Sequence, residues 1–291
     1  MPQLVPRRSL LALALLGLGG RAAASEASFE VRDLELAGDR RIGRRMTLLV
    51  PRHTPGPVPL LVLLHGLGET HDERLGAHAW LDRYGLGTSY ERLLRPPVAP
   101  LSSKSRHFDD ARLAELNRDL LAHPFRGLAV ACPFTPNVYR ATDRKTLLDA
   151  YAGWLADEVI PRARREADVL PGPKHTGLDG CSLGGYAGLE VLLRRPALFG
   201  AWGSVQGALG GHRVARYAEE LRAVVSAHGT RLHLETSLGD PFRGVNESLS
   251  LALTKLGVSH DFVMPPGPHD QPFLRDSGTL EMLLWHDRAL R

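Results

Sequence analysis

The stretch Gly180-Cys181-Ser182-Leu183-Gly184-Gly185 decides how this sequence of 291 residues is interpreted. It has the spacing G-x-S-x-G, follows the short segment 176–178 and leads into an apolar pattern with helical spacing. A serine on a sharp turn between a strand and a helix has strained backbone angles, and glycines are needed beside it where strand and helix nearly collide. The stretch therefore predicts that Ser182 projects from such a turn as a nucleophile.

Two partners follow Ser182 in the order acid, then histidine, each just beyond an expected strand. Residues 231–237 alternate like a strand and lead to Asp240 at a turn, and residues 259–264 indicate another strand with His269 in the loop after it. A serine hydroxyl is a poor nucleophile at neutral pH, so an imidazole must take its proton and a carboxylate must orient that imidazole. We expect Asp240 as the acid and His269 as the base, with Glu235 as the rival acid.

An oxyanion hole is expected upstream, after the apolar run 59–64, which is typical of a buried parallel strand. This run ends in His65-Gly66-Leu67-Gly68. We expect the backbone N–H groups of Leu67 and Leu183 to bind the developing negative charge, where losing one donor typically costs about 10²- to 10³-fold in rate. His65 is expected to brace the loop.

These motifs together resemble the alpha/beta-hydrolase superfamily, and within it the esterase group that includes esterase-D-like and feruloyl-esterase-like enzymes. The matching stretches are residues 60–68, 158–161, 180–185, 239–240 and 267–270, and the resemblance covers roughly residues 28–290. It implies an α/β fold with a mostly parallel central sheet and helices on both faces. It also implies a serine esterase of the carboxylesterase type that works through an acyl-enzyme, without a cofactor, on small-molecule, glycan or lipid esters.

The cysteines separate this chain from some of those relatives. Some feruloyl-esterase and tannase relatives pair a cysteine before the nucleophile with one after the catalytic histidine, whereas here Asp270 follows His269. Cys181 as nucleophile, as in dienelactone-hydrolase relatives, would place Asp179 and Leu183 where glycines are required. In the superfamily's strand order another strand separates Cys132 from Cys181, so two free, buried thiols are expected.

Other functions use the same constellation. A serine peptidase would need the same three side chains, and an acyltransferase to a sugar or lipid alcohol, as in mycolyltransferase relatives, would differ in excluding water. A non-catalytic binding protein on the same fold is the alternative from a different class. The complete Ser182, Asp240 and His269 set favours the esterase.

Residues 1–24 have the pattern of an export signal. Arg7 and Arg8 precede an apolar run, residues 10–20, that is too short to cross a bilayer, and small residues follow Arg21. The pair of arginines resembles the twin-arginine consensus, with an ordinary secretory signal as the alternative. We expect a bacterial protein in the periplasm or outside the cell, without stable insertion into the membrane.

Composition is that of one globular domain, expected over residues 25–291, with 43% apolar and 23% charged residues. The net charge of +4 falls to about +1 without Arg7, Arg8 and Arg21. Because no basic stripe with interleaved aromatic residues stands out, nucleic acid is not expected as a partner. The 13 histidines form no pair at metal-ligand spacing, so no metal is expected.

The remaining pattern alternates strands and helices, which favours a mostly parallel sheet. Residues 29–36 and 44–50 are expected as two antiparallel strands and residues 127–131 as a further strand. Helices are expected over residues 147–166, 185–193, 214–228, 245–256 and 274–290. The long segment 71–126, with helices expected around 79–94 and 109–121, is interpreted as a lid or cap insertion that shapes the substrate pocket, with a surface insertion that has no role in binding as the alternative.

Overall fold

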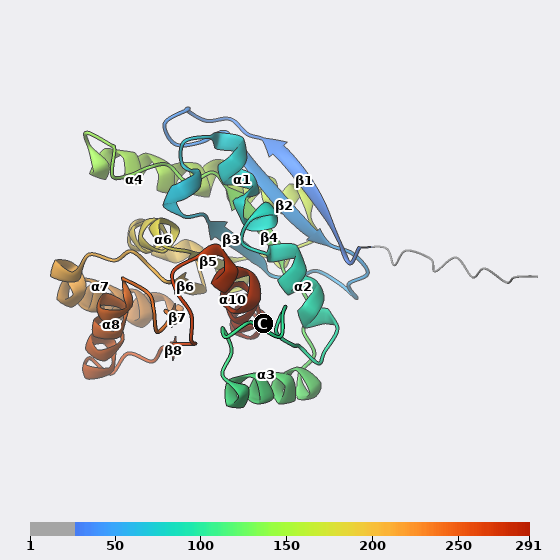
Figure 1. Cartoon of the computed structure of the whole chain (residues 1–291). Coiled ribbons are helices and arrows are strands. Elements are labelled where there is room, and N and C mark those ends of the chain that lie inside the picture. Colours follow the sequence, from blue (N-terminus) through green and yellow to red (C-terminus); the bar gives the residue numbers. More distant parts are fainter. Residues whose placement is uncertain (1–26) are drawn as a thin grey trace, which may run out of the picture.

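The computed structural model describes residues 27–291, and within them eight strands form one sheet in the order β1-β2-β4-β3-β5-β6-β7-β8 (Figure 1). The expected export signal, residues 1–24, lies outside the described residues. The strands are β1 (Phe29–Glu35), β2 (Arg45–Pro51), β3 (Leu60–Leu64), β4 (Ala129–Pro133), β5 (Thr176–Gly180), β6 (Ala201–Val205), β7 (Arg231–Glu235) and β8 (Asp261–Val263).

The sheet is mostly parallel, as the sequence predicts. Strands β1 and β2 pair antiparallel with each other, β2 pairs antiparallel with β4, and the strands from β4 to β8 across the sheet are parallel. Strand β4 begins two residues after the predicted Gly127, because Gly127 has a φ of 93° and turns the chain into the strand. Strand β6 was not predicted.

One face of the sheet is covered by the helices between β4 and β8 in sequence, which pack on side chains such as Leu60, Val62 and Leu64. These helices are α4 (Arg144–Trp154), the π-helical turn η2 (Leu155–Val159), α5 (Ile160–Glu166), α6 (Leu183–Arg194), α7 (Val214–His228) and α8 (Arg243–Lys255). The predicted helix 147–166 is confirmed but begins earlier, because Asp143 caps it by accepting a hydrogen bond from the Thr146 N–H at 3.0 Å.

The other face carries Leu61 and Leu63 and is covered by helices from two distant parts of the chain. They are α1 (Glu73–Asp82), α2 (Leu86–Leu94), α3 (Asp110–Ala122), α9 (Gln271–Phe273), the π-helical turn η6 (Leu274–Gly278) and α10 (Thr279–Ala289). The prediction of one helix around 79–94 was wrong: Gly85, with a φ of 77°, separates α1 from α2. Segment 71–126 therefore supplies much of the helical layer that covers this face of the sheet.

The remaining elements of the described chain are short 3₁₀ turns: η1 (Leu67–Glu69), η3 (Pro173–His175), η4 (Pro196–Leu198) and η5 (Gly211–Arg213). Within residues 27–291, every helix is too short or too polar to cross a lipid bilayer.

A buried carboxylate ties the irregular loop 95–109 to the chain that follows His269. Asp276, in η6, is 3% exposed. Its carboxylate accepts hydrogen bonds from the Arg92 guanidinium, the N–H of Leu101 and the Ser105 hydroxyl, and it lies within hydrogen-bonding distance of the His107 ring. The loop is thereby fastened to the segment that begins with the expected base.

Candidate active site

The sharp turn at Ser182 joins the end of β5 to the start of α6. Ser182 has φ 54° and ψ −115°, a strained conformation for a residue with a side chain. A Cβ on Gly184 would lie 2.3 Å from the Leu64 carbonyl oxygen, and one on Gly180 would lie 2.5 Å from the backbone of Gly184. The glycines of G-x-S-x-G are therefore required, because the start of α6 lies against the ends of both β3 and β5 without room for a Cβ.

His269 and Asp240 are hydrogen-bonded. The His269 Nδ1 lies 2.8 Å from Asp240 Oδ1, and the Asp240 side chain is fully buried while that of His269 is 25% exposed. Asp240 also accepts hydrogen bonds from the Thr236 hydroxyl at 2.6 Å and from the Phe242 N–H at 2.9 Å. These contacts fix the carboxylate, so Nδ1 carries the ring proton and Nε2 is left unprotonated in the neutral imidazole.

A cleft of about 250 Å³ brings Ser182, His269 and Leu67 together. Leu67 is the first residue of η1, and Leu183 is the first residue of α6, so neither N–H has an acceptor within its own helix. The side chain of Leu183 is buried in the core on the α6 face, and Leu183 is not among the residues that line the cleft, so the role expected for its backbone N–H stays a prediction. The start of α6 also adds the positive end of a helix dipole beside Ser182.

His65 braces the loop after β3, as expected. The ring is fully buried, its Nε2 accepts a hydrogen bond from the Thr135 N–H at 2.8 Å, and its Nδ1 lies 2.8 Å from the Gly66 carbonyl oxygen. Burial lowers the pKa of His65 to about 4. The neutral ring thus joins the Leu67 loop to the end of β4.

Three residues of the cleft were missed by the sequence analysis. Gln206, just after β6, has a φ of 51° and donates hydrogen bonds to Ser237 Oγ at 2.7 Å and to the Pro268 carbonyl at 2.9 Å. It therefore fixes the chain immediately before His269. Glu69 and Tyr84, both buried, line the cleft and are hydrogen-bonded to each other. Predicting β6 would have drawn attention to Gln206, because polar residues at the carboxyl ends of parallel strands face ligand sites.

Three other carboxylates close in sequence to the expected catalytic residues, the rival acid Glu235 among them, have other surroundings. Asp179 is fully buried and lies 2.8 Å from His286 Nε2, so it has a different histidine as its partner. Neither carboxyl oxygen of Glu235 has a hydrogen-bond partner within the described part of the chain, and burial raises its pKa well above the usual value. Asp270 caps α9 by accepting a hydrogen bond from the Phe273 N–H at 2.9 Å.

Both cysteines are free and buried, as predicted. Strand β3 lies between β4, which carries Cys132, and β5, which Cys181 follows. Burial raises the pKa of Cys181 well above its usual value, which disfavours a thiolate nucleophile. Among residues 27–291, no group of three or more His, Cys, Asp or Glu side chains could hold a metal ion.

Comparison by sequence finds no matching family and no matching characterised protein. Solved structures do match. The substrate-bound fluorophosphonate-binding serine hydrolase F of Staphylococcus aureus is similar with a TM-score of 0.60 and 15% identity, over 89% of this chain and 98% of that chain. A ferulic acid esterase of Anaeromyces mucronatus, in complex with ferulic acid, is similar with a TM-score of 0.57 and 13% identity, over 93% and 94% of the two chains.

The enterobactin esterase of Shigella flexneri is similar with a TM-score of 0.57 and 19% identity, over 91% of this chain and 61% of that chain. At identities of 13% to 19%, it is the TM-scores of 0.57 to 0.60 that show a shared fold, the alpha/beta-hydrolase fold, and a shared fold does not by itself assign a function.

Proposed function

We propose that this protein is a serine esterase that hydrolyses carboxylic esters, with Ser182 as nucleophile, His269 as general base and acid, and Asp240 as the orienting carboxylate. The observation that carries the proposal is the 2.8 Å hydrogen bond from His269 to Asp240 beside a cleft that also contains the strained Ser182. The structural likeness to serine hydrolases and esterases supports it.

In the proposed reaction, Nε2 of His269 takes the hydroxyl proton while Ser182 Oγ bonds to the ester carbonyl carbon. The carbonyl oxygen becomes an oxyanion that accepts hydrogen bonds from the backbone N–H groups of Leu67 and Leu183. The C–O bond to the alcohol then breaks, and the alcohol leaves with the proton from His269. Water repeats the sequence on the acyl-enzyme and releases the acid.

The test is hydrolysis of p-nitrophenyl esters from acetyl to palmitoyl by the wild type and by Ser182→Ala. Removing the nucleophile is expected to lower kcat by at least about 10⁴-fold. The matched control is Cys181→Ala at the adjacent position, which should keep activity within a few fold. Circular dichroism checks that each protein is folded. A folded wild type that hydrolyses no ester, or a Ser182→Ala variant that keeps its activity, would contradict the proposal.

We further propose that residues 1–24 direct export, on the evidence of the sequence pattern alone. The mature N-terminus is expected near residue 25 in an exported fraction, as determined by N-terminal sequencing. Replacing Arg7 and Arg8 by lysines should block export by the twin-arginine route and leave a general secretory route working. Intracellular accumulation of the uncleaved wild type would contradict this proposal.

A further inference from the structure

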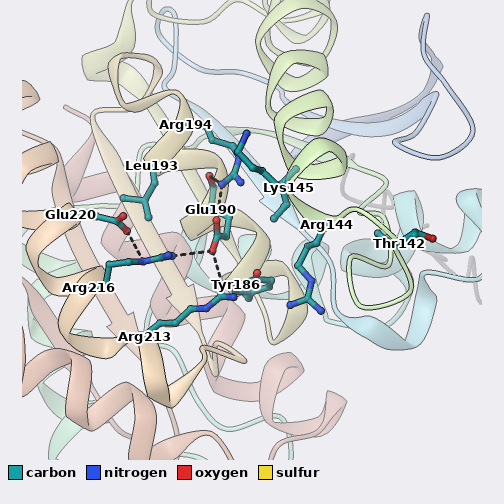
Figure 2. Close-up of a pocket in the computed structure, with 12 residues that line it drawn as sticks. Thr142, Arg144, Lys145, Tyr186, Glu190, Leu193, Arg194, Arg213, Arg216 and Glu220 are labelled. Carbon is teal, nitrogen blue, oxygen red and sulfur yellow. Dashed lines mark hydrogen bonds and ion pairs between the residues drawn. The ribbon is translucent and has the colours of Figure 1, made fainter.

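A second cleft, larger than the one at Ser182, lies among helices α4, α6 and α7. Its volume is about 650 Å³, against about 250 Å³ at Ser182. The cations that line it are Arg144, Lys145, Arg194, Arg213 and Arg216 (Figure 2). So many like charges around one cleft are held together only if negative groups balance them.

The carboxylates of the protein balance these cations incompletely. Glu190 is buried and pairs with Arg194 at 2.6 Å and with Arg213 at 3.4 Å. Asp149 pairs with Arg194 at 2.7 Å and with Lys145 at 2.9 Å, and Glu220 pairs with Arg216 at 3.5 Å. Figure 2 shows these guanidinium groups converging on Glu190 from both sides. Three carboxylates thus face the five cations of the cleft, which leaves an excess of two positive charges.

Arg144 has no carboxylate partner in the described part of the chain. Its Nε donates to the Val138 carbonyl at 3.1 Å, and its guanidinium lies 5.2 Å from the centre of the Tyr139 ring. Tyr139 in turn stacks on Tyr186, with ring centres 6.0 Å apart and an angle of 9° between the planes. This aromatic pair holds a guanidinium at the edge of the cleft with its terminal N–H groups available.

Tyr186 supplies a hydrogen-bonding group that lacks a partner. The residue is 3% exposed and lines the cleft, and its hydroxyl has no hydrogen-bond partner among residues 27–291. In Figure 2 its ring lies between Arg213 and Arg144. A buried hydroxyl without a partner is unfavourable. A ligand oxygen in the cleft would satisfy it while it neutralises the surplus cations.

We propose that this cleft binds an anionic oxygen group, a carboxylate or a phosphate, through Arg144, Arg213 and the Tyr186 hydroxyl, and that the ester substrate carries this group at its far end. Planar guanidinium groups bind carboxylates and phosphates through paired, charge-assisted hydrogen bonds, which matches the donors present. The assignment to the substrate rests on the proposed esterase function.

The position of the cleft connects it to the candidate active site. Tyr186 lies one helical turn beyond Ser182 on α6, about 6 Å along the helix axis. Its stacking partner Tyr139 also lines a surface hollow that contains Leu67 and Gly68 from the expected oxyanion loop. An extended ester bound at Ser182 can therefore run past the tyrosine pair and place its remote anionic group among the arginines.

The experiment compares two esters of equal chain length, p-nitrophenyl octanoate and p-nitrophenyl hydrogen suberate, which has a terminal carboxylate. The wild type is expected to have the lower KM for the suberate. Arg144→Gln and Tyr186→Phe should each raise the KM for the suberate by about 10-fold or more and leave the octanoate unchanged. Tyr186→Phe breaks no hydrogen bond within the protein, so its urea midpoint should match or exceed that of the wild type.

The matched control is Arg222→Gln, on α7 but at the surface, where Arg222 pairs with Glu219 at 2.7 Å. This variant removes one positive charge, as Arg144→Gln does, and should leave the KM for both esters unchanged. Binding of inorganic phosphate, measured by calorimetry, tests the cleft independently of catalysis. It should be lost in Arg144→Gln and Tyr186→Phe.

The outcomes separate the two proposals. Phosphate binding that depends on Arg144 and Tyr186, with equal KM values for the two esters, would support an anion site but overturn its assignment to the substrate in favour of a free anion. A wild type that hydrolyses no ester refutes the esterase, while the phosphate measurement still decides the cleft. Absence of both phosphate binding and discrimination between the esters overturns the inference.

Discussion

Replacing Glu235 by glutamine should make the stability of this protein less sensitive to rising pH. Glu235 is fully buried at the end of β7, and neither of its oxygens has a hydrogen-bond partner in the described residues. Burial, with the nearby charges of Glu281 and Asp179, raises its pKa well above the usual value, and Arg112 opposes this only in part. The folded protein therefore keeps Glu235 protonated at pH values where the unfolded chain has lost that proton.

The sign and size follow from proton linkage. Above the unfolded pKa of about 4.3, the folded state binds one more proton than the unfolded state, so the free energy of unfolding falls as the pH rises. The fall is about 1.36 kcal/mol per pH unit for one proton, up to the pKa of the folded state. From pH 5.5 to pH 7.5, the stability of the variant relative to the wild type should therefore grow, by at most about 2.7 kcal/mol. Glutamine has the same shape and no such dependence.

The assay is urea unfolding of the wild type and Glu235→Gln at pH 5.5, 6.5 and 7.5. The stability of the variant relative to the wild type should increase across the series, because every other titrating group is common to both proteins. The control is Glu219→Gln at an exposed position of α7, whose difference from the wild type should stay constant. A difference for Glu235→Gln that does not change with pH would refute the reasoning. Esterase activity should persist in this variant, because His269 is paired with Asp240 instead.

Three further outcomes are expected. Asp240→Asn should lower kcat by about 10⁴-fold without unfolding the protein, because the imidazole loses the carboxylate that sets its tautomer; activity against p-nitrophenyl acetate measures this, and near-normal turnover would contradict the assignment. Gln206→Ala should lower kcat by about 10- to 100-fold with little change in KM, since it releases the carbonyl just before the histidine; a change confined to KM would speak against this positioning role. Gly184→Ala should destabilise the fold by about 3 kcal/mol or more, whereas Gly56→Ala, with open space around it, should be nearly neutral in the same urea titration.

The local chemistry of the turn and of the loops could be predicted from the sequence. Ser182, Asp240 and His269 each follow a strand, and parallel strands bring their carboxyl ends to one edge of the sheet. Their side chains therefore converge without any knowledge of the packing. The hydrogen bond between His269 and Asp240 agrees with this expectation. The roles assigned to the three side chains in catalysis remain predictions.

What could not be predicted depends on tertiary contacts. Strand β6 contains Gly203 among small and aromatic residues, without the alternation or the apolar run that marks a strand, and it is stabilised by pairing with β5 and β7. The cleft around Glu190 draws Arg144, Tyr186 and Arg213 from three separate elements, and no spacing along the chain relates them.

The fastening of loop 95–109 to Asp276 limits how this scaffold can be re-engineered. A transplanted loop would have to bring donors equivalent to the N–H of Leu101 and the hydroxyl of Ser105, or leave a desolvated carboxylate seven residues from His269 short of partners. Loop 95–109 and the segment that contains His269 therefore depend on each other: exchanging the whole loop is expected to disturb that segment, and single substitutions that spare the anchoring residues are expected to leave it in place. Directed evolution of specificity in this region should accordingly favour point changes over loop grafts.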